Sequence, residues 1–185
     1  MARVPYPDPS TFDADAREAL GKLAPLNIFR MMGGGAGLLP SFLKLGNHLL
    51  FRTQLDPVLR EIAIIRVGVL SKASYEVHQH EKIGRDIGMS ETLIRAIHAG
   101  PDDPAFDEMQ KLVMRFTDDV VHNVRAGDAT FQPLLARLSL QELQELTITV
   151  GFYMMVSRYL ETFGIEIEPP GTEGVAMPAA QKTRP

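Results

Sequence analysis

The sequence contains no cysteine, and this absence removes a large group of possible chemistries. Without a thiol there is no disulfide framework, no zinc–thiolate or iron–sulfur site and no cysteine nucleophile. Basic residues are also few, with 19 Lys and Arg against 23 Asp and Glu, for a net charge of -4. That balance argues against general binding to nucleic acids or anionic membranes, which require a basic surface. Whatever chemistry the chain performs is therefore not thiol chemistry.

Long apolar runs are missing as well. The strongest are residues 62–70, which Arg66 interrupts, and residues 148–156, and both are too short to span a bilayer. The N-terminus lacks the apolar segment of a secretory signal. We therefore expect a cytoplasmic protein, and its 185 residues are enough for one domain.

What is present is apolar spacing of the helical kind, which predicts an all-α fold. Asp56-Pro57 is a typical helix start, and Ser139 with Glu142 forms a capping box at another. The centre of that last helix is apolar on all sides, so we expect it to be buried. The expected helices cover residues 13–23, 38–52, 56–70, 74–87, 90–99, 106–124, 130–137 and 139–163.

Composition at the two ends predicts the domain organisation. Pro5, Pro7 and Pro9 predict an extended arm over residues 1–11. A single helical domain is expected over residues 12–168, followed by a flexible tail at residues 169–185. Within the domain, Gly33–Gly37 predicts a mobile loop. The preceding strand and the Lys-Ser/Thr pair of a phosphate-binding loop are both missing there.

The densest group of polar residues lies at positions 75–81. Glu76 and His80 are four residues apart and share a helix face, so the carboxylate can orient the imidazole and raise its pKa. Glu61 lies in an apolar helix and needs a partner or a proton if it is buried. If that partner is His80 or Glu76, the three residues form a proton relay. In the alternative interpretation Glu61 pairs with an Arg such as Arg66, and Glu76–His80 is a surface pair.

A metal site is a weaker possibility. His78 with Glu81, and Asp119 with His122, have the three-residue spacing of helical di-metal ligands. The order is reversed in the first pair, and an Asp replaces the Glu in the second. His80-Glu81 also lacks the second His of a zinc protease signature. We therefore predict no metal.

Two blocks of sequence resemble a known family. They are residues 59–90, which contain Leu-Arg-Glu-Ile-Ala-Ile-Ile-Arg-Val-Gly and Ala-Ser-Tyr-Glu-Val-His-Gln-His, and residues 144–166. Both are similar to the carboxymuconolactone decarboxylase family, which also contains the alkyl hydroperoxide reductase D-type proteins. The resemblance covers Asp56–Glu166. It implies a single-domain helical bundle with the motif on a central helix pair, assembled as a homodimer, trimer or hexamer.

The peroxidase branch of this family carries a Glu and then Cys-x-x-Cys-x-x-x-His. On this sequence the Glu falls on Glu61 and the His on His80, whereas the two Cys positions fall on Ala73 and Glu76. The proton-handling residues are thus present and both thiols are absent. A peroxidase of this type needs a thiolate, so that role is disfavoured.

The decarboxylase branch works without the thiol pair and is the better analogue. It implies a cofactor-independent lyase for a small lactone or related acid, with His80 as proton donor, Glu76 orienting it and Glu61 as the second member of the relay. Tyr75 or Arg66 is the candidate for holding a substrate carboxylate or carbonyl oxygen, although Arg66 could instead pair with a buried acid. A non-catalytic oligomeric binding protein and a metal- or peroxide-dependent oxidoreductase are the alternatives.

Overall fold

The computed structural model describes residues 1–169, and within them the secondary structure is entirely helical. This confirms the predicted all-α fold. The tail predicted at residues 169–185 lies, except for its first residue, outside the described residues. The residues expected to form one helical domain divide into two compact units. Unit 1 contains Met1–Phe51 and the chain from Leu160 onward, and unit 2 contains Arg52–Tyr159.

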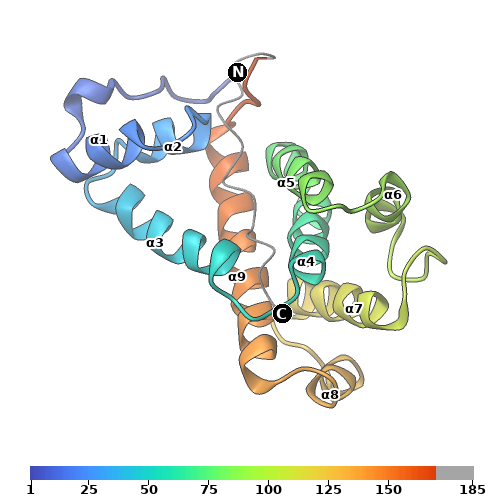
Figure 1. Ribbon diagram of the computed structural model, residues 1–185. Helices are drawn as coiled ribbons and strands as arrows, with labels where there is room; N and C mark the ends of the chain where they lie inside the picture. Colours follow the sequence, from blue (N-terminus) through green and yellow to red (C-terminus); the bar gives the residue numbers. More distant parts are fainter. Residues whose placement is uncertain (170–185) are drawn as a thin grey trace. The chain divides into compact units, whose positions relative to one another are not determined.

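Unit 1 begins with a short 3-10 turn at Pro9–Thr11. Its helices are α1 (Ala14–Gly21), α2 (Asn27–Met32) and α3 (Leu38–Phe51). Unit 2 carries the helices α4 (Pro57–Leu70), α5 (Ser74–Asp86), α6 (Glu91–Ala99), α7 (Glu108–Asn123), α8 (Asp128–Leu135) and most of α9 (Leu140–Phe163). Figure 1 labels all nine α-helices of residues 1–169. All but α2 correspond to a predicted helix.

Contacts with the last described residues hold unit 1 together. The α2 helix starts without a side-chain cap of its own, and Glu168 supplies one by accepting a hydrogen bond from the Asn27 backbone N–H at 2.5 Å. Arg3 in the N-terminal arm donates its backbone N–H to the carbonyl of Phe163 at 2.9 Å. The predicted loop at Gly33–Gly37 forms turns between α2 and α3, and Gly33 lies against the ring of Phe12, leaving no room for a side chain.

Helix α4 is the centre of unit 2. Asp56 caps it by accepting hydrogen bonds from the backbone N–H groups of Val58 and Leu59, and every residue from Leu59 to Gly68 is buried. An α-helix that is buried on all sides packs against several neighbours. Here α5, α6 and α7 all contact α4, as can be followed in Figure 1.

The turn predicted around residues 71–74 is confirmed, and it folds α5 back onto α4. Ala73 donates its backbone N–H to the carbonyl of Gly68 at 2.9 Å, and Lys72 donates to Val69 at 3.1 Å, which together form a Schellman motif. Gly68 lets the helices approach, because a Cβ there would lie 2.9 Å from Cγ2 of Val77. Lys72 occupies the left-handed position at φ 57°, where glycine is usual.

Replacing Lys72 by glycine is therefore expected to stabilise the protein. The left-handed conformation costs a non-glycine residue about 1 kcal/mol, and the greater freedom of glycine in the unfolded chain offsets part of that gain. Urea unfolding should show a rise in the free energy of unfolding of up to about 1 kcal/mol for Lys72→Gly. Ser71→Gly, at an ordinary helical φ of -80°, is the matched control and should be destabilising. Equal destabilisation by both changes would contradict the strain assigned to Lys72.

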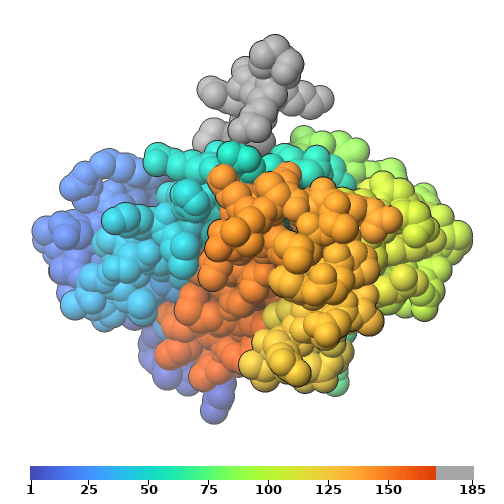
Figure 2. All heavy atoms as spheres, turned by 90° about the horizontal axis from the view of Figure 1, so that it is seen from below, coloured from blue at the N-terminus to red at the C-terminus, as the bar shows by residue number. Residues whose placement is uncertain are grey.

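The prediction that α9 is buried on all sides is wrong. Ile148 and Met155 are 53% and 50% exposed, and Gly151 between them is exposed as well. They lie on one face because residues three, four and seven apart share a side of a helix. Figure 2 shows the orange atoms of α9 at the surface. The opposite face, with Val150, Tyr153 and Val156, is buried.

No helix within residues 1–169 is both long enough and apolar enough to cross a membrane. The expectations of a cytoplasmic location and of a homo-oligomer stay predictions.

Candidate active site

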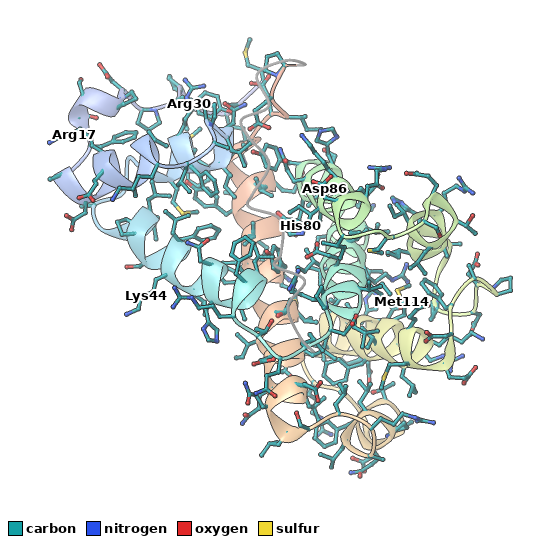
Figure 3. The ribbon with its side chains drawn as sticks, in the orientation of Figure 1. Arg17, Arg30, Lys44, His80, Asp86 and Met114 are labelled. Atoms are coloured by element: carbon teal, nitrogen blue, oxygen red, sulfur yellow. The ribbon has the colours of Figure 1, made fainter. Side chains whose placement is uncertain are left out.

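Glu61, Glu76 and His80 meet inside unit 2. His80 Nδ1 lies 2.7 Å from Oε2 of Glu61, and His80 Nε2 lies 3.0 Å from Oε1 of Glu76. The three residues are 5% exposed or less. Figure 3 labels His80 on the side of α5 that faces α9. The structure therefore brings the three predicted relay residues together, and the alternative of a Glu76–His80 surface pair does not hold.

The sequence places these groups through two local features. Glu76 and His80 are one helical turn apart on α5, so their side chains lie side by side. The tight turn at Ser71–Ala73 then folds α5 along α4, which brings Glu61 near the start of α4 to His80 across the helix pair.

Arg60 completes the cluster. Its Nε donates a hydrogen bond to Oε1 of Glu61 at 3.0 Å, and its side chain is also buried. Both oxygens of Glu61 are thus engaged, one by Arg60 and the other by His80. With His80 protonated, two cations face two carboxylates and the cluster is neutral, which is the condition for keeping charges in a buried place.

The cluster favours the charged form of His80. Burial alone would lower the pKa of this imidazole, but the charge and hydrogen bond of Glu61, with those of Glu76, outweigh burial and raise the pKa to about 9. His80 is therefore an imidazolium at neutral pH, and each of its two N–H groups points to a carboxylate.

Tyr153 of α9 closes the site on its other side. Its ring meets the His80 ring edge to face, with centroids 4.8 Å apart at 81°, and Phe152 packs in the same way on Tyr153 at 5.3 Å. Burial, together with the negative charges of Glu76 and Glu61, raises the pKa of Tyr153 well above its ordinary value. The phenol is therefore neutral and can donate a hydrogen bond.

Arg66 and Tyr75, the two residues expected to hold the substrate, do not join the cluster around His80. Arg66 forms a two-pronged ion pair with Asp118, at 2.6 and 2.8 Å, and donates a further hydrogen bond to the carbonyl of Ile97 at 3.0 Å. Its guanidinium is thus committed to α7 and to the end of α6, and it is Arg60 that pairs with Glu61. Tyr75 is buried on α5 about 140° around the helix from His80, by the helical repeat.

The two acids weighed as metal ligands, Glu81 and Asp119, have other partners. Glu81 bonds to His98 at 2.8 Å and to Arg85 at 3.2 Å. Asp119 accepts hydrogen bonds from Gly127, Thr130 and Asn123, which fixes the turn between α7 and α8. In the part of the chain that the structure describes, no group of three His, Asp or Glu side chains is arranged to hold a metal ion.

Arg60 and Tyr153 are the residues of the site that sequence reasoning missed. An arginine inside an otherwise apolar, buried helix is a signal that a buried acid is near, and Arg60 is the immediate neighbour of Glu61. The sequence pattern does not indicate a role for Tyr153 in the site, because a tyrosine in an apolar helix is typical of a protein core.

Comparison with known proteins supports the resemblance seen in the sequence. The sequence model of the Carboxymuconolactone decarboxylase family matches residues 37–122, which contain Arg60, Glu61, Glu76 and His80 but not Tyr153. The comparison with curated proteins gave no match.

Solved structures share the fold over most of the chain. One is an uncharacterized peroxidase-related protein from Ralstonia eutropha JMP134, titled alkylhydroperoxidase AhpD core, with a TM-score of 0.78 and 16% identity over 90% of this chain and 92% of that one. An uncharacterized peroxidase-related protein from Silicibacter sp. TM1040 has a TM-score of 0.76 and 16% sequence identity over 90% of each chain. A protein of unknown function from Agrobacterium tumefaciens has a TM-score of 0.68 and 20% sequence identity, over 72% of this chain and 92% of its own. Residues 37–122 of this cysteine-free chain thus match the carboxymuconolactone decarboxylase family, and the chain shares the helical fold of the AhpD-like solved structures.

Proposed function

We propose that this protein is a cofactor-independent lyase that decarboxylates a small lactone or a related acid whose carbanion is stabilised by a carbonyl group. The observation that carries the proposal is the buried His80 imidazole held between the carboxylates of Glu61 and Glu76, which raise its pKa to about 9. Such a group is a proton donor at neutral pH, as general acid catalysis requires. The absence of cysteine from these 185 residues disfavours the thiol peroxidase alternative.

The geometry refines the order of the relay. Both nitrogens of His80 are engaged, Nδ1 by Glu61 and Nε2 by Glu76. Glu76 meets His80 through Oε1, so its other oxygen, Oε2, is not used in this pair. We therefore place Glu76 at the end of the relay, facing the substrate, with His80 behind it as the source of the proton. Glu76 also occupies the position of a family cysteine, so a carboxylate replaces a thiol at the reacting end.

The proposed step balances as follows. The bond between the substrate carbon and its carboxylate breaks, carbon dioxide leaves, and the electron pair moves into the adjacent carbonyl to give an enolate. The enolate carbon then takes a proton that Glu76 relays from His80 Nε2. Solvent restores the proton to His80, and Glu61, itself held by Arg60, stabilises the imidazolium before the transfer and after its recovery.

Carbon dioxide release from freshly generated carboxymuconolactone tests this function. We expect the parent protein to release it and Glu76→Gln to lower kcat by about 10²–10⁴-fold, because the amide cannot relay a proton. Glu81→Gln on the same helix, whose carboxylate pairs with Arg85 and His98, is the matched control and should leave kcat unchanged.

Two outcomes would count against the proposal. Absence of carbon dioxide release by the parent protein would remove the family's namesake substrate and favour other acids or a binding role. Release at equal rates by the parent and by Glu76→Gln would remove Glu76 from the mechanism.

A further inference from the structure

Three hydroxyl-bearing side chains on α9 are buried, and the hydroxyls of two of them, Thr149 and Ser157, have no hydrogen-bond partner within residues 1–169. The three side chains are those of Thr149, Tyr153 and Ser157, which are 0%, 4% and 1% exposed. The hydroxyls of Thr149 and Ser157 are fully sealed. The Tyr153 hydroxyl is not one of these sealed, unpartnered atoms, although the Tyr153 side chain is buried.

The three residues form a row along the helix. Each is four residues from the next, so they share one face of α9, with a helical rise of about 6 Å from each residue to the next. Buried polar groups in proteins nearly always have a partner, and leaving one unmet is costly. The unmet hydroxyls of Thr149 and Ser157 therefore mark a face of α9 whose polar groups this chain does not itself satisfy, and Tyr153 lies between them on that face.

Tyr153 is the middle member and the one that meets the relay. Its ring contacts His80, whose Nε2 bonds to Oε1 of Glu76. A phenol on α9 and a carboxylate on α5 thus both lie against the same imidazole.

We propose that Tyr153 is a catalytic residue that donates its hydroxyl to the substrate carbonyl oxygen on which negative charge develops. This rests on the proposed lyase function and deepens it. The ligand class is a small carbonyl compound whose reacting oxygen is an enolate in the transition state. Preorganised donors aimed at such an oxygen are among the largest contributions to catalysis. Tyr153 lies outside residues 37–122, the segment that the family model matches.

The variant Tyr153→Phe removes the hydroxyl and keeps the ring against His80. We expect kcat for decarboxylation to fall about 10²–10³-fold with little change in KM, since the donor acts mainly in the transition state. Tyr159→Phe is the matched control on the same helix and should keep the parent kcat. Circular dichroism and thermal melting should show both variants folded.

Binding of 4-nitrophenol gives a second readout that needs no turnover. This phenol mimics an enolate when ionised, and its visible absorption reports which form is bound. We expect the parent protein and Tyr159→Phe to bind the ionised form, and Tyr153→Phe to bind it at least about 10-fold more weakly, as for a lost hydrogen bond to a charged group.

The outcomes separate the two proposals. Turnover by the parent with an equal kcat in Tyr153→Phe overturns the role of Tyr153 and leaves the lyase standing. No turnover by the parent, with binding of 4-nitrophenolate that depends on Tyr153, overturns the substrate assignment and supports the donor site. Equal binding by parent and Tyr153→Phe, or no binding, together with no turnover, overturns both.

Discussion

Glu61→Gln is expected to lower the free energy of unfolding by about 3–5 kcal/mol, the range found when one partner of a buried ion pair is removed. Glu61 is fully buried, and its two oxygens bond to Arg60 at 3.0 Å and to His80 at 2.7 Å. The amide keeps the volume and loses the charge. Arg60 then loses the charge of its acid partner, and His80 keeps the charge of Glu76 alone.

Urea unfolding of the parent and of Glu61→Gln at neutral pH measures this change. Glu108→Gln is the matched control, because Glu108 is 82% exposed and its pair with Lys111 lies at the surface, where such pairs contribute about 0–1 kcal/mol. A loss of less than about 1 kcal/mol in Glu61→Gln would mean that the carboxylate does not hold the two cations in the folded protein.

The free energy of unfolding is expected to fall by roughly 3 kcal/mol between about pH 6.5 and pH 9. His80 has a folded pKa of about 9, against an ordinary pKa of 6.5 in the unfolded chain. Because the folded state binds this proton more tightly, the stabilisation is complete below the unfolded pKa and is lost as the pH rises through the folded one. The magnitude follows from 1.36 kcal/mol for each tenfold difference in proton affinity.

Unfolding curves collected at intervals across this pH range test the linkage. In His80→Gln the decline should disappear, whereas in His98→Gln, whose imidazole is half exposed, it should remain. A parent protein whose stability is flat from pH 6.5 to 9, or rises, would show that His80 does not gain its proton on folding.

The burial of so many charges has a functional explanation. A buried ion pair adds little to stability compared with well-packed apolar side chains of the same size. Stability therefore does not explain why these charges are buried between α4 and α5. The close approach at Gly68 and the apolar core of α4 already hold the two helices together without the Arg60–Glu61–His80–Glu76 cluster. What the cluster does provide is an imidazolium that persists at neutral pH.

The sequence predicts the local half of the site well. Glu76 and His80 follow from spacing on one helix, and Glu61 follows from its apolar surroundings together with the turn at residues 71–74. The sequence also predicts the helix starts at Asp56 and Ser139, because a helix cap is an interaction between residues close in sequence.

Interactions between distant segments could not be predicted. The pairing of Arg66 with Asp118 joins residues that are 52 positions apart, and the sequence around Arg66 does not indicate which acid it pairs with. Helix α2 is capped by Glu168, far along the chain, and so carries no start signal of its own. The exposed face of α9 was missed because apolar residues at the surface look the same in sequence as those in a core.

The central claim is that His80 is charged and held between Glu61 and Glu76. An NMR titration of the histidine ring protons tests it most directly, with the His80 signal assigned through His80→Gln. We predict a pKa of about 9 for His80 in the folded protein, and a lower pKa in Glu61→Gln. A His80 pKa at or below 6.5 would contradict the account, because burial would then outweigh the two carboxylates and the imidazole would be neutral where the relay needs its proton.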